Sequence, residues 1–346
     1  MANTETGTAS RAEAAPLPLV SVVVIGRNEG ERLSACLASV QRMRRKGFAC
    51  ELIYVDSAST DGSPERAAAL GAEVIRRHPL RLSAALARNA GWQAAAGEWV
   101  LFLDGDTELD PDFVASALPT FADPTVAVVW GHRREKCPEQ SVYVRVLDFD
   151  WLYPPGDSAF CGGDALMRRS ALAEVGGFDS ALIAGEEPEL CRRLRSRGGR
   201  IVHLDLAMTR HDLAIRDFAA YWRRAFRSGH AYAEVAARFA ASSDPLWRRE
   251  ARRNLLHAGG LLAAPGLLAY AGLVAPVWAA AGLGLAALVL LRSWRRAAWK
   301  CPNWSDRWRY LVHSHLQQIP IFCGQLACRW HAWRGHQRPL IEYKAR

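Results

Sequence analysis

The eight cysteines of this 346-residue chain include no Cys-x-x-Cys pair, and their spacing matches no zinc pattern. This absence argues against a zinc site and indicates reduced thiols in a cytosolic domain. Residues 1–16 are mostly small and polar and lack the apolar segment of a secretory signal, so we expect a disordered tail there. No internal repeat is visible, and the length allows one large domain or two ordinary ones.

Residues 255–291 lack Asp, Glu, Lys and Arg. A membrane-spanning helix needs about 20 apolar residues. The stretch therefore predicts a transmembrane or re-entrant helical hairpin over 255–292, turning near Pro276. A buried hairpin in a soluble protein is the alternative. Flanking arginines such as Arg253 and Arg292 favour the membrane, and the positive-inside rule places both flanks in the cytoplasm, at the inner membrane.

The formal net charge is +9, and part of this excess lies beside the hairpin. We expect a basic linker at 246–254 and a basic amphipathic region at 293–346. This placement favours a membrane surface over nucleic acid as the partner. Residues 307–330 mix Trp, Tyr, His and Arg with apolar side chains, which predicts an interfacial amphipathic helix kinked at Pro320.

Residues 17–245 alternate short apolar runs with helical spacing, the pattern of a doubly wound α/β domain with a mostly parallel sheet. We expect strands at 20–25, 51–56, 73–75, 99–103, 126–130 and 200–204. We expect helices at 29–45, 64–70, 83–96, 112–121, 170–175, 188–197 and 217–238. A less regular part is expected between residue 130 and about Tyr153.

Two aspartates, Asp104 and Asp106, directly follow the strand expected at 99–103. Ligands bind at the carboxyl ends of strands in open α/β sheets. Carboxylate oxygens there suit Mg²⁺ or Mn²⁺, which also takes substrate phosphates as ligands. A turn without a metal would also explain the Asp-Gly-Asp triplet.

Other polar residues stand at neighbouring strand ends. Asp56 is expected to hydrogen-bond a nucleobase or ribose, and Arg27 and Asn28 to face the nucleotide. Arg88 is a candidate for the diphosphate, with a salt bridge on a helix surface as the alternative. Asp61 either contacts the ligand or caps its own turn.

A second acidic cluster contains Glu186, Glu187 and Glu189. These carboxylates are candidates for a catalytic base. They also fit the acidic first turn of the helix expected at 188–197. The two explanations are compatible.

Together these motifs resemble family 2 of the nucleotide-sugar glycosyltransferases, which have the GT-A fold. The resemblance is carried by residues 20–29, 55–62, 87–91, 97–106 and 175–179. It covers about residues 19–215 with five motifs in order. It implies a GT-A domain over 17–245, followed by the membrane hairpin and an amphipathic helix.

The resemblance also implies roles for single residues. Asp56 would contact the base, Asp106 would be the main metal ligand, and Asp104 would lie near the ribose or the metal. The usual Glu-Asp pair of the family falls on Glu186 and Glu187. Glu187 would then be the general base, one methylene longer than the usual Asp.

Further candidates lie outside the central motifs. Asp164 would contact the acceptor or donor sugar, and His211 would complete the metal shell. Arg223 and Arg224 follow Trp222 but differ from the Gln-x-x-Arg-Trp motif of processive synthases. We therefore expect transfer of a single sugar, with these arginines near the diphosphate or the acceptor. Binding of lipid headgroups by this basic helix is the alternative.

The sequence thus predicts a membrane-associated, inverting glycosyltransferase. It would use a nucleotide-diphosphate sugar, Mg²⁺ or Mn²⁺, and a lipid-linked or envelope polysaccharide acceptor, alongside other envelope-biosynthesis proteins. A non-catalytic membrane assembly subunit with a degenerate domain is one alternative. A nucleotidyltransferase is another, although residues 26–30 are too acidic and too short for its phosphate loop.

Overall fold

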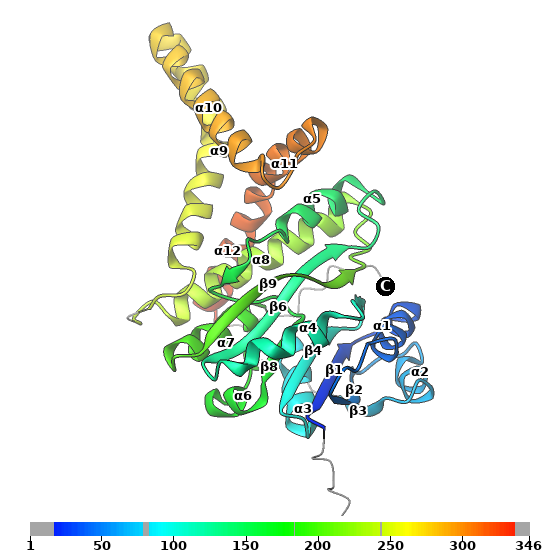
Figure 1. Cartoon of the computed structure of the whole chain (residues 1–346). Coiled ribbons are helices and arrows are strands. Elements are labelled where there is room, and N and C mark those ends of the chain that lie inside the picture. Colours follow the sequence, from blue (N-terminus) through cyan, green and yellow to red (C-terminus); the bar gives the residue numbers. More distant parts are fainter. Residues whose placement is uncertain (1–16, 79–82, 183, 243, 336–346) are drawn as a thin grey trace, which may run out of the picture.

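A computed structural model describes residues 17–78, 83–182, 184–242 and 244–335 (Figure 1). The tail predicted at 1–16 and the last part of the C-terminal region, 336–346, lie outside these residues. Nine strands of the described chain form one sheet in the order β3-β2-β1-β4-β8-β6-β9-β5, with β7 on β9. The strands are β1 (Leu19–Gly26), β2 (Ala49–Ser57), β3 (Glu73–Arg77), β4 (Trp99–Asp104), β5 (Thr107–Leu109), β6 (Val126–Glu135), β7 (Gly156–Asp157), β8 (Ala165–Arg168) and β9 (Arg200–His211).

The first half of the sheet is parallel, as predicted, and the second half is mixed. Strands β3, β2, β1 and β4 run parallel, whereas β8 is antiparallel to both β4 and β6. Strands β5 and β7 are antiparallel to β9. These three antiparallel strands are short, and none of them was expected from the sequence.

The register of the parallel strands sets the position of the acidic residues. The buried β-branched residues of β1 lie between β2 and β4. Gly26 pairs with Asp56, and Ile25 pairs with Asp104. The carboxyl ends of these strands therefore meet at one edge of the sheet, where ligands bind in open α/β folds.

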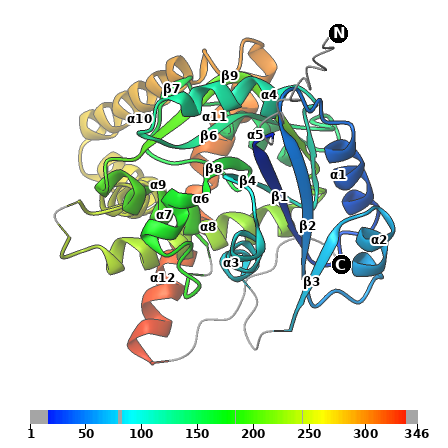
Figure 2. The same cartoon turned by 60° about the horizontal axis from the view of Figure 1, so that its bottom comes forward.

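Helices cover both faces of this half of the sheet, with α1 and α2 on one side of β1–β3 and α3 on the other (Figure 2). The helices of the domain are α1 (Glu31–Gln41), α2 (Ser63–Ala69), α3 (Ala84–Ala94), α4 (Phe113–Ala117), the 3₁₀ helix η1 (Leu118–Ala122), α5 (Val142–Asp150), α6 (Arg169–Val175), α7 (Glu186–Ser196) and α8 (Phe218–Arg238).

Helix α5 lies where the sequence predicted irregular structure. Its residues are mostly β-branched, aromatic or aspartate, a composition for which propensity alone does not favour a helix. Ser141 caps the helix by accepting a hydrogen bond from the Val144 amide at 3.0 Å. Val144 and Leu147 are buried against Tyr221 of α8, so tertiary packing outweighs local propensity.

The C-terminal helices are α9 (Arg248–Val274), α10 (Pro276–Ala297), α11 (Trp304–Leu316) and α12 (Gln318–Trp333). Helices α9 and α10 form a hairpin that projects from the domain (Figure 1) and turns at Ala275, beside the expected Pro276. Both are long and apolar enough to cross a membrane, and their apolar windows are 6% and 0% buried. These two helices point to membrane association.

Two features of this region differ from the prediction. The basic linker expected at 246–254 is helical from Arg248, so it forms the first turns of α9. The single helix expected at 307–330 is two helices that meet at Gln317, and Pro320 lies in the first turn of α12. Proline is tolerated there because first-turn amides have no intrahelical partner.

Helix α12 packs on α8 through two glycines. A Cβ atom at Gly324 would overlap the Phe226 carbonyl oxygen, and one at Gly229 would overlap the Ile321 carbonyl oxygen. The two backbones therefore touch, which only glycine permits at these positions. The last helix is thus part of the packed domain.

Candidate active site

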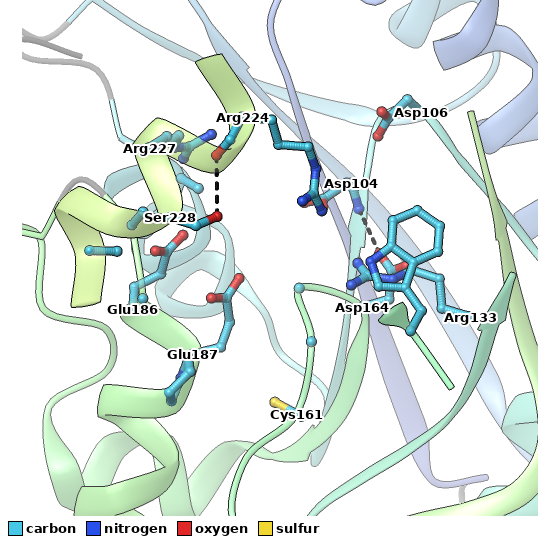
Figure 3. A pocket seen from close by; sticks show the side chains of 18 of the residues that line it. Asp104, Asp106, Arg133, Cys161, Asp164, Glu186, Glu187, Arg224, Arg227 and Ser228 are labelled. Atoms are coloured by element: carbon cyan, nitrogen blue, oxygen red, sulfur yellow. Dashed lines mark hydrogen bonds between the residues drawn. The ribbon is translucent and has the colours of Figure 1, made fainter. Parts of the chain in front are cut away.

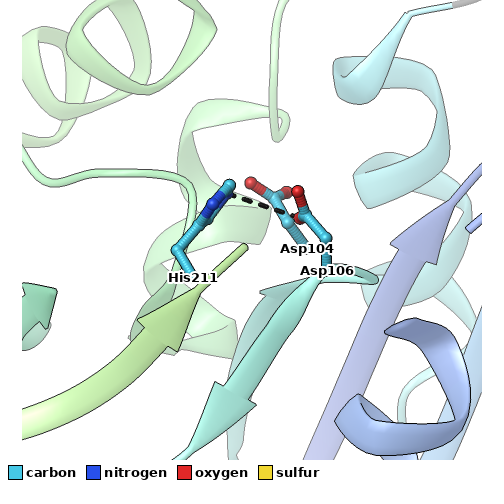
Figure 4. Close-up of side chains that lie close together, drawn as sticks. All are labelled: Asp104, Asp106 and His211. Atoms are coloured by element: carbon cyan, nitrogen blue, oxygen red, sulfur yellow. Dashed lines mark ion pairs between the residues drawn. The ribbon is translucent and has the colours of Figure 1, made fainter. Parts of the chain in front are cut away.

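The end of β4, the following turn and the end of β9 bring three possible metal ligands together. Asp104, Asp106 and His211 each offer a ligand atom, and these atoms lie within 4.8 Å of one another (Figure 4). His211 Nε2 is 3.4 Å from Asp106 Oδ1. Pairing of β5 with β9 places His211 opposite Thr107, directly after Asp106. The sequence named all three residues, and the sheet supplies the contact that the sequence alone could not.

A buried arginine joins this cluster to the second acidic cluster. Arg88 on α3 is 2% exposed, and its Nη2 atom lies 3.0 Å from Asp104 Oδ1. Its Nη1 atom lies 3.0 Å from Oε1 of Glu186 and 3.0 Å from Oε1 of Glu187. Arg88 therefore points inward, and the surface salt bridge considered from the sequence is wrong.

The two glutamates begin helix α7, after Gly185 in the left-handed conformation. The acidic first turn is therefore real, and it coexists with a position at the cavity. Burial, and then the neighbouring charge of Glu187, raise the pKa of Glu186 to about 7, while Arg88 opposes this shift. Glu189 instead pairs with Arg193 and is not among the described residues that line the cavity.

Asp164 and Gly163 lie against Asp104 and Arg88 and help to fix their positions. Asp164 accepts a hydrogen bond from the Asp104 amide at 3.1 Å and another from the Thr209 hydroxyl at 2.8 Å. Burial, followed by the charge of Asp104, raises the pKa of Asp164 to about 6. A Cβ at Gly163 would lie 2.6 Å from Arg88 Nη2 and 3.0 Å from Asp104 Oδ2. Only a glycine lets this loop approach the network.

Two loops joined by hydrogen bonds form the side of the site where a nucleotide is expected. Asn28, with φ of 55°, accepts a hydrogen bond from the Thr60 amide at 2.8 Å. Asp61 accepts the amides of Gly30 at 2.9 Å and of Ser63 at 3.0 Å, so it caps the turn. Both Arg27 and Asn28 line the cavity.

Asp56, predicted to contact the base, is held by hydrogen bonds at the end of β2. It is 1% exposed and accepts hydrogen bonds from the Tyr54 hydroxyl at 3.1 Å and the Ser59 amide at 2.9 Å. Among the described residues, its neighbours Ser57 and Thr60 line the cavity and Asp56 does not. Asp56 therefore shapes the loop that would face a nucleotide.

All these groups border one cavity of about 1220 Å³. Arg224 and Arg227 point into it from α8, and Arg133 lies beside Asp164 (Figure 3). Arg223 is exposed and falls outside the described lining, so of the two arginines named from the sequence only Arg224 reaches the cavity. Helical spacing could have distinguished Arg224 from Arg223, because residues 224, 227 and 231 share the face of α8 that lines the cavity.

The sequence also missed the far wall of the cavity. This wall comes from residues that follow the expected catalytic domain: Trp247, Arg253, Asn254, Lys300, Gln317, Gln318 and Ile321. No motif marks them, because tertiary packing brings α9, α12 and the links on either side of α11 to the cavity.

Comparison with known proteins agrees with this geometry. Residues 21–176 match the family described as Glycosyl transferase family 2, and residues 99–330 match the one described as Glycosyl transferase family group 2. The pre-mycofactocin glycosyltransferase of Mycobacterium tuberculosis is 30% identical over 243 residues, which cover 66% of this chain and 49% of that protein. The chain thus spans about half the length of this relative.

Two further proteins extend the comparison. Glycosyltransferase AglE of Haloferax volcanii is 24% identical over 229 residues, covering 63% of this chain and 74% of that one. The mannosyltransferase PcManGT from Pyrobaculum calidifontis, solved with GDP-Man and Mn²⁺, has a TM-score of 0.66 at 22% identity. The superposition covers 91% of this chain and 88% of that one, so the shared fold includes C-terminal helices.

Proposed function

The chain belongs to the family 2 group of glycosyltransferases, and on this premise we propose that it is a metal-dependent, inverting enzyme that adds a single sugar at a membrane. The donor is a nucleotide-diphosphate sugar, and the acceptor is lipid-linked or an envelope polysaccharide. The catalytic domain faces the cytoplasm at the inner membrane, where other envelope-biosynthesis proteins are its partners.

One observation carries this proposal: Arg88 holds Asp104 and the Glu186–Glu187 pair around the same cavity. Of the pair, the Glu187 side chain is 17% exposed and that of Glu186 is 5% exposed. Glu187 is therefore placed to take the proton of the acceptor hydroxyl. Glu186 is its electrostatic neighbour in the more buried position.

The donor set of Asp104, Asp106 and His211 fits Mg²⁺ or Mn²⁺, because two carboxylates and one imidazole lie close together. When bound, such an ion stabilises the negative charge of the departing diphosphate. Arg27 and Asn28 border the nucleotide end of the cavity, and Arg224 lies where it can assist the diphosphate or the acceptor. The Mn²⁺ and GDP-Man of the structural neighbour make that class of cation and donor the first to test.

A donor screen of the purified protein with Mn²⁺ and a panel of nucleotide sugars tests the proposal. We expect hydrolysis or transfer with one donor class. Glu187→Gln should lower kcat by about 10²–10⁴ while donor affinity is kept, since a general base contributes on that scale. Metal-dependent nucleotide binding without turnover on any donor would instead favour the assembly-subunit alternative.

A further inference from the structure

Part of the cavity wall is basic and aromatic, and of its residues only Arg224 has a place in the proposed transfer chemistry. We name it the basic arm, and it is lined by Tyr153, Arg224, Arg227, Tyr232, Arg253 and Lys300. Arg224 is an electrostatic neighbour of Tyr153, and Arg253 is one of Tyr232, which itself neighbours Tyr153. Lys300 Nζ lies 5.7 Å from the Tyr153 ring centroid. These six residues therefore border one continuous space.

The basic arm carries a clear excess of positive charge. Four cationic side chains line it, while Asp150 is an electrostatic neighbour of Lys300 and Glu186 one of Arg227. Both oxygens of Asp150 already accept hydrogen bonds, from the Tyr310 hydroxyl at 2.8 Å and from His313 Nε2 at 3.0 Å. Arginine and lysine together are the residues with which proteins bind phosphate groups.

Lys300 is held in place within the basic arm. Its Nζ atom donates a hydrogen bond to the Phe149 carbonyl at 3.0 Å and faces the Tyr310 ring at 5.7 Å. Burial lowers the pKa of its ammonium, and the charge of Asp150 opposes the change. A half-buried ammonium fixed in this way can meet an anion with little loss of side-chain entropy.

The position of Arg253 links the arm to the membrane. It lies on α9 two residues before the apolar stretch that begins at residue 255. At a rise of about 1.5 Å per residue, this places Arg253 at the level where the hairpin enters a bilayer. Arg253 is exposed as well as lining the cavity, so the arm opens there. A ligand with a lipid tail and an anionic head matches this setting.

We propose that the basic arm binds the phosphate group of a lipid-linked acceptor, whose reacting hydroxyl then faces Glu187. This inference rests on the proposed function for the reaction, but the binding site can be tested without it. The shared chemistry is a phosphate ester, which a lipid phosphate or a soluble sugar phosphate can supply. The apolar stretch that begins two residues after Arg253 favours the lipid.

The test measures binding of farnesyl phosphate to the full chain in detergent, without donor or metal. We expect saturable binding that excess UDP does not displace, and at least tenfold weaker binding of farnesol. Arg253→Gln and Lys300→Gln should each weaken farnesyl phosphate binding about tenfold, as expected for loss of a charge-assisted hydrogen bond. Arg253→Lys should retain most of the affinity.

Arg252→Gln is the matched control, because Arg252 is an exposed neighbour on α9 outside the described cavity lining. Glucose 1-phosphate distinguishes the two sources of phosphate. If it binds as tightly as farnesyl phosphate, with the same dependence on Arg253, the basic arm binds soluble phosphates and the lipid assignment is wrong.

Three outcomes would contradict the site itself: equal binding of farnesol, displacement by UDP, or an equal effect of Arg252→Gln. An oligosaccharide that binds regardless of Arg253 and Lys300 favours a polysaccharide acceptor instead. Because none of these measurements needs turnover, they remain informative if no donor is found.

Discussion

Arg88 Nη1 lies 3.0 Å from Oε1 of Glu187, and this contact ties helix α3 to the start of helix α7 across the cavity. The same guanidinium contacts Asp104. The candidate base and a candidate metal ligand therefore share one buried cation. The Arg88 side chain therefore helps to set the distance between Glu187 and Asp104.

Replacing Arg88 with Lys should lower kcat/KM by at least about 10², because a single ammonium cannot hold three carboxylates as the planar guanidinium does. Steady-state kinetics and the thermal midpoint measure the effect. Arg66→Lys is a suitable control, since Arg66 forms a more exposed pair with Glu31. Wild-type activity in Arg88→Lys would remove the network from the mechanism.

The rate should depend on the charge of Glu186. With its pKa raised to about 7, Glu186 is protonated in acid, and the nearby Glu187 is then a weaker base. We expect kcat/KM to rise with pH through about 7. In Glu186→Gln this inflection should disappear. A flat profile in the wild type would contradict the proposed coupling.

The same group affects folding with a defined sign. The folded-state pKa of Glu186 is raised above its ordinary value of 4.5, so its contribution to stability is present below that pH and is lost as pH rises through about 7. The thermal midpoint of Glu186→Gln, relative to the wild type, should therefore be higher at pH 8 than at pH 5. Thermal scans at both pH values measure this difference.

Metal affinity should depend on ligands from two places, the turn after β4 and the end of β9. Asp106→Asn and His211→Ala should each weaken Mn²⁺ binding at least about tenfold, because each removes one donor from a cluster of three. Titration followed by electron paramagnetic resonance of free Mn²⁺ reports this directly. Asp112→Asn, in an exposed pair with Arg44, should leave the affinity as it is.

A methyl group at Gly163 should disturb the site although no charged residue is replaced. The added Cβ would lie 2.6 Å from Arg88 Nη2. We expect Gly163→Ala to lower kcat/KM about tenfold or more through displacement of Arg88 and Asp104. Gly162→Ala meets the flexible end of Arg133 at 3.2 Å and should be much milder.

The contact between α8 and α12 predicts an effect far from the carboxylates. Gly324→Ala should separate the helices, because its Cβ would overlap the Phe226 carbonyl. Activity and resistance to proteolysis should both fall. Gly259→Ala on α9 is the control, since nothing lies within 4 Å of its added Cβ in the described structure. Equal behaviour of the two variants would show that α12 is dispensable.

The parallel half of the fold was predictable because β1, β2 and β4 are buried runs with clear ends. Asp104 and Asp106 were found for the same reason, as polar residues directly after such a strand. His211 rested on the family resemblance, and its contact with Asp106 depends on the short β5–β9 pairing, which carries no sequence signal of its own.

The basic side of the cavity was harder to predict. Arg227 could have been found from helical spacing with Arg224. Arg253 and Lys300 could not, because they appeared to belong to membrane flanks and reach the cavity only through tertiary packing. Local patterns predict elements and strand ends, whereas sites assembled from distant segments need the packing itself.

The far wall of the cavity has a consequence for the order of biosynthesis. Lys300, Gln317 and Gln318 are translated after the apolar hairpin of α9 and α10. Since the amino-terminal part of a chain emerges first, the hairpin is available for membrane insertion before this wall exists. Under the proposed membrane attachment, the chain is therefore anchored before the wall of the candidate active site is complete.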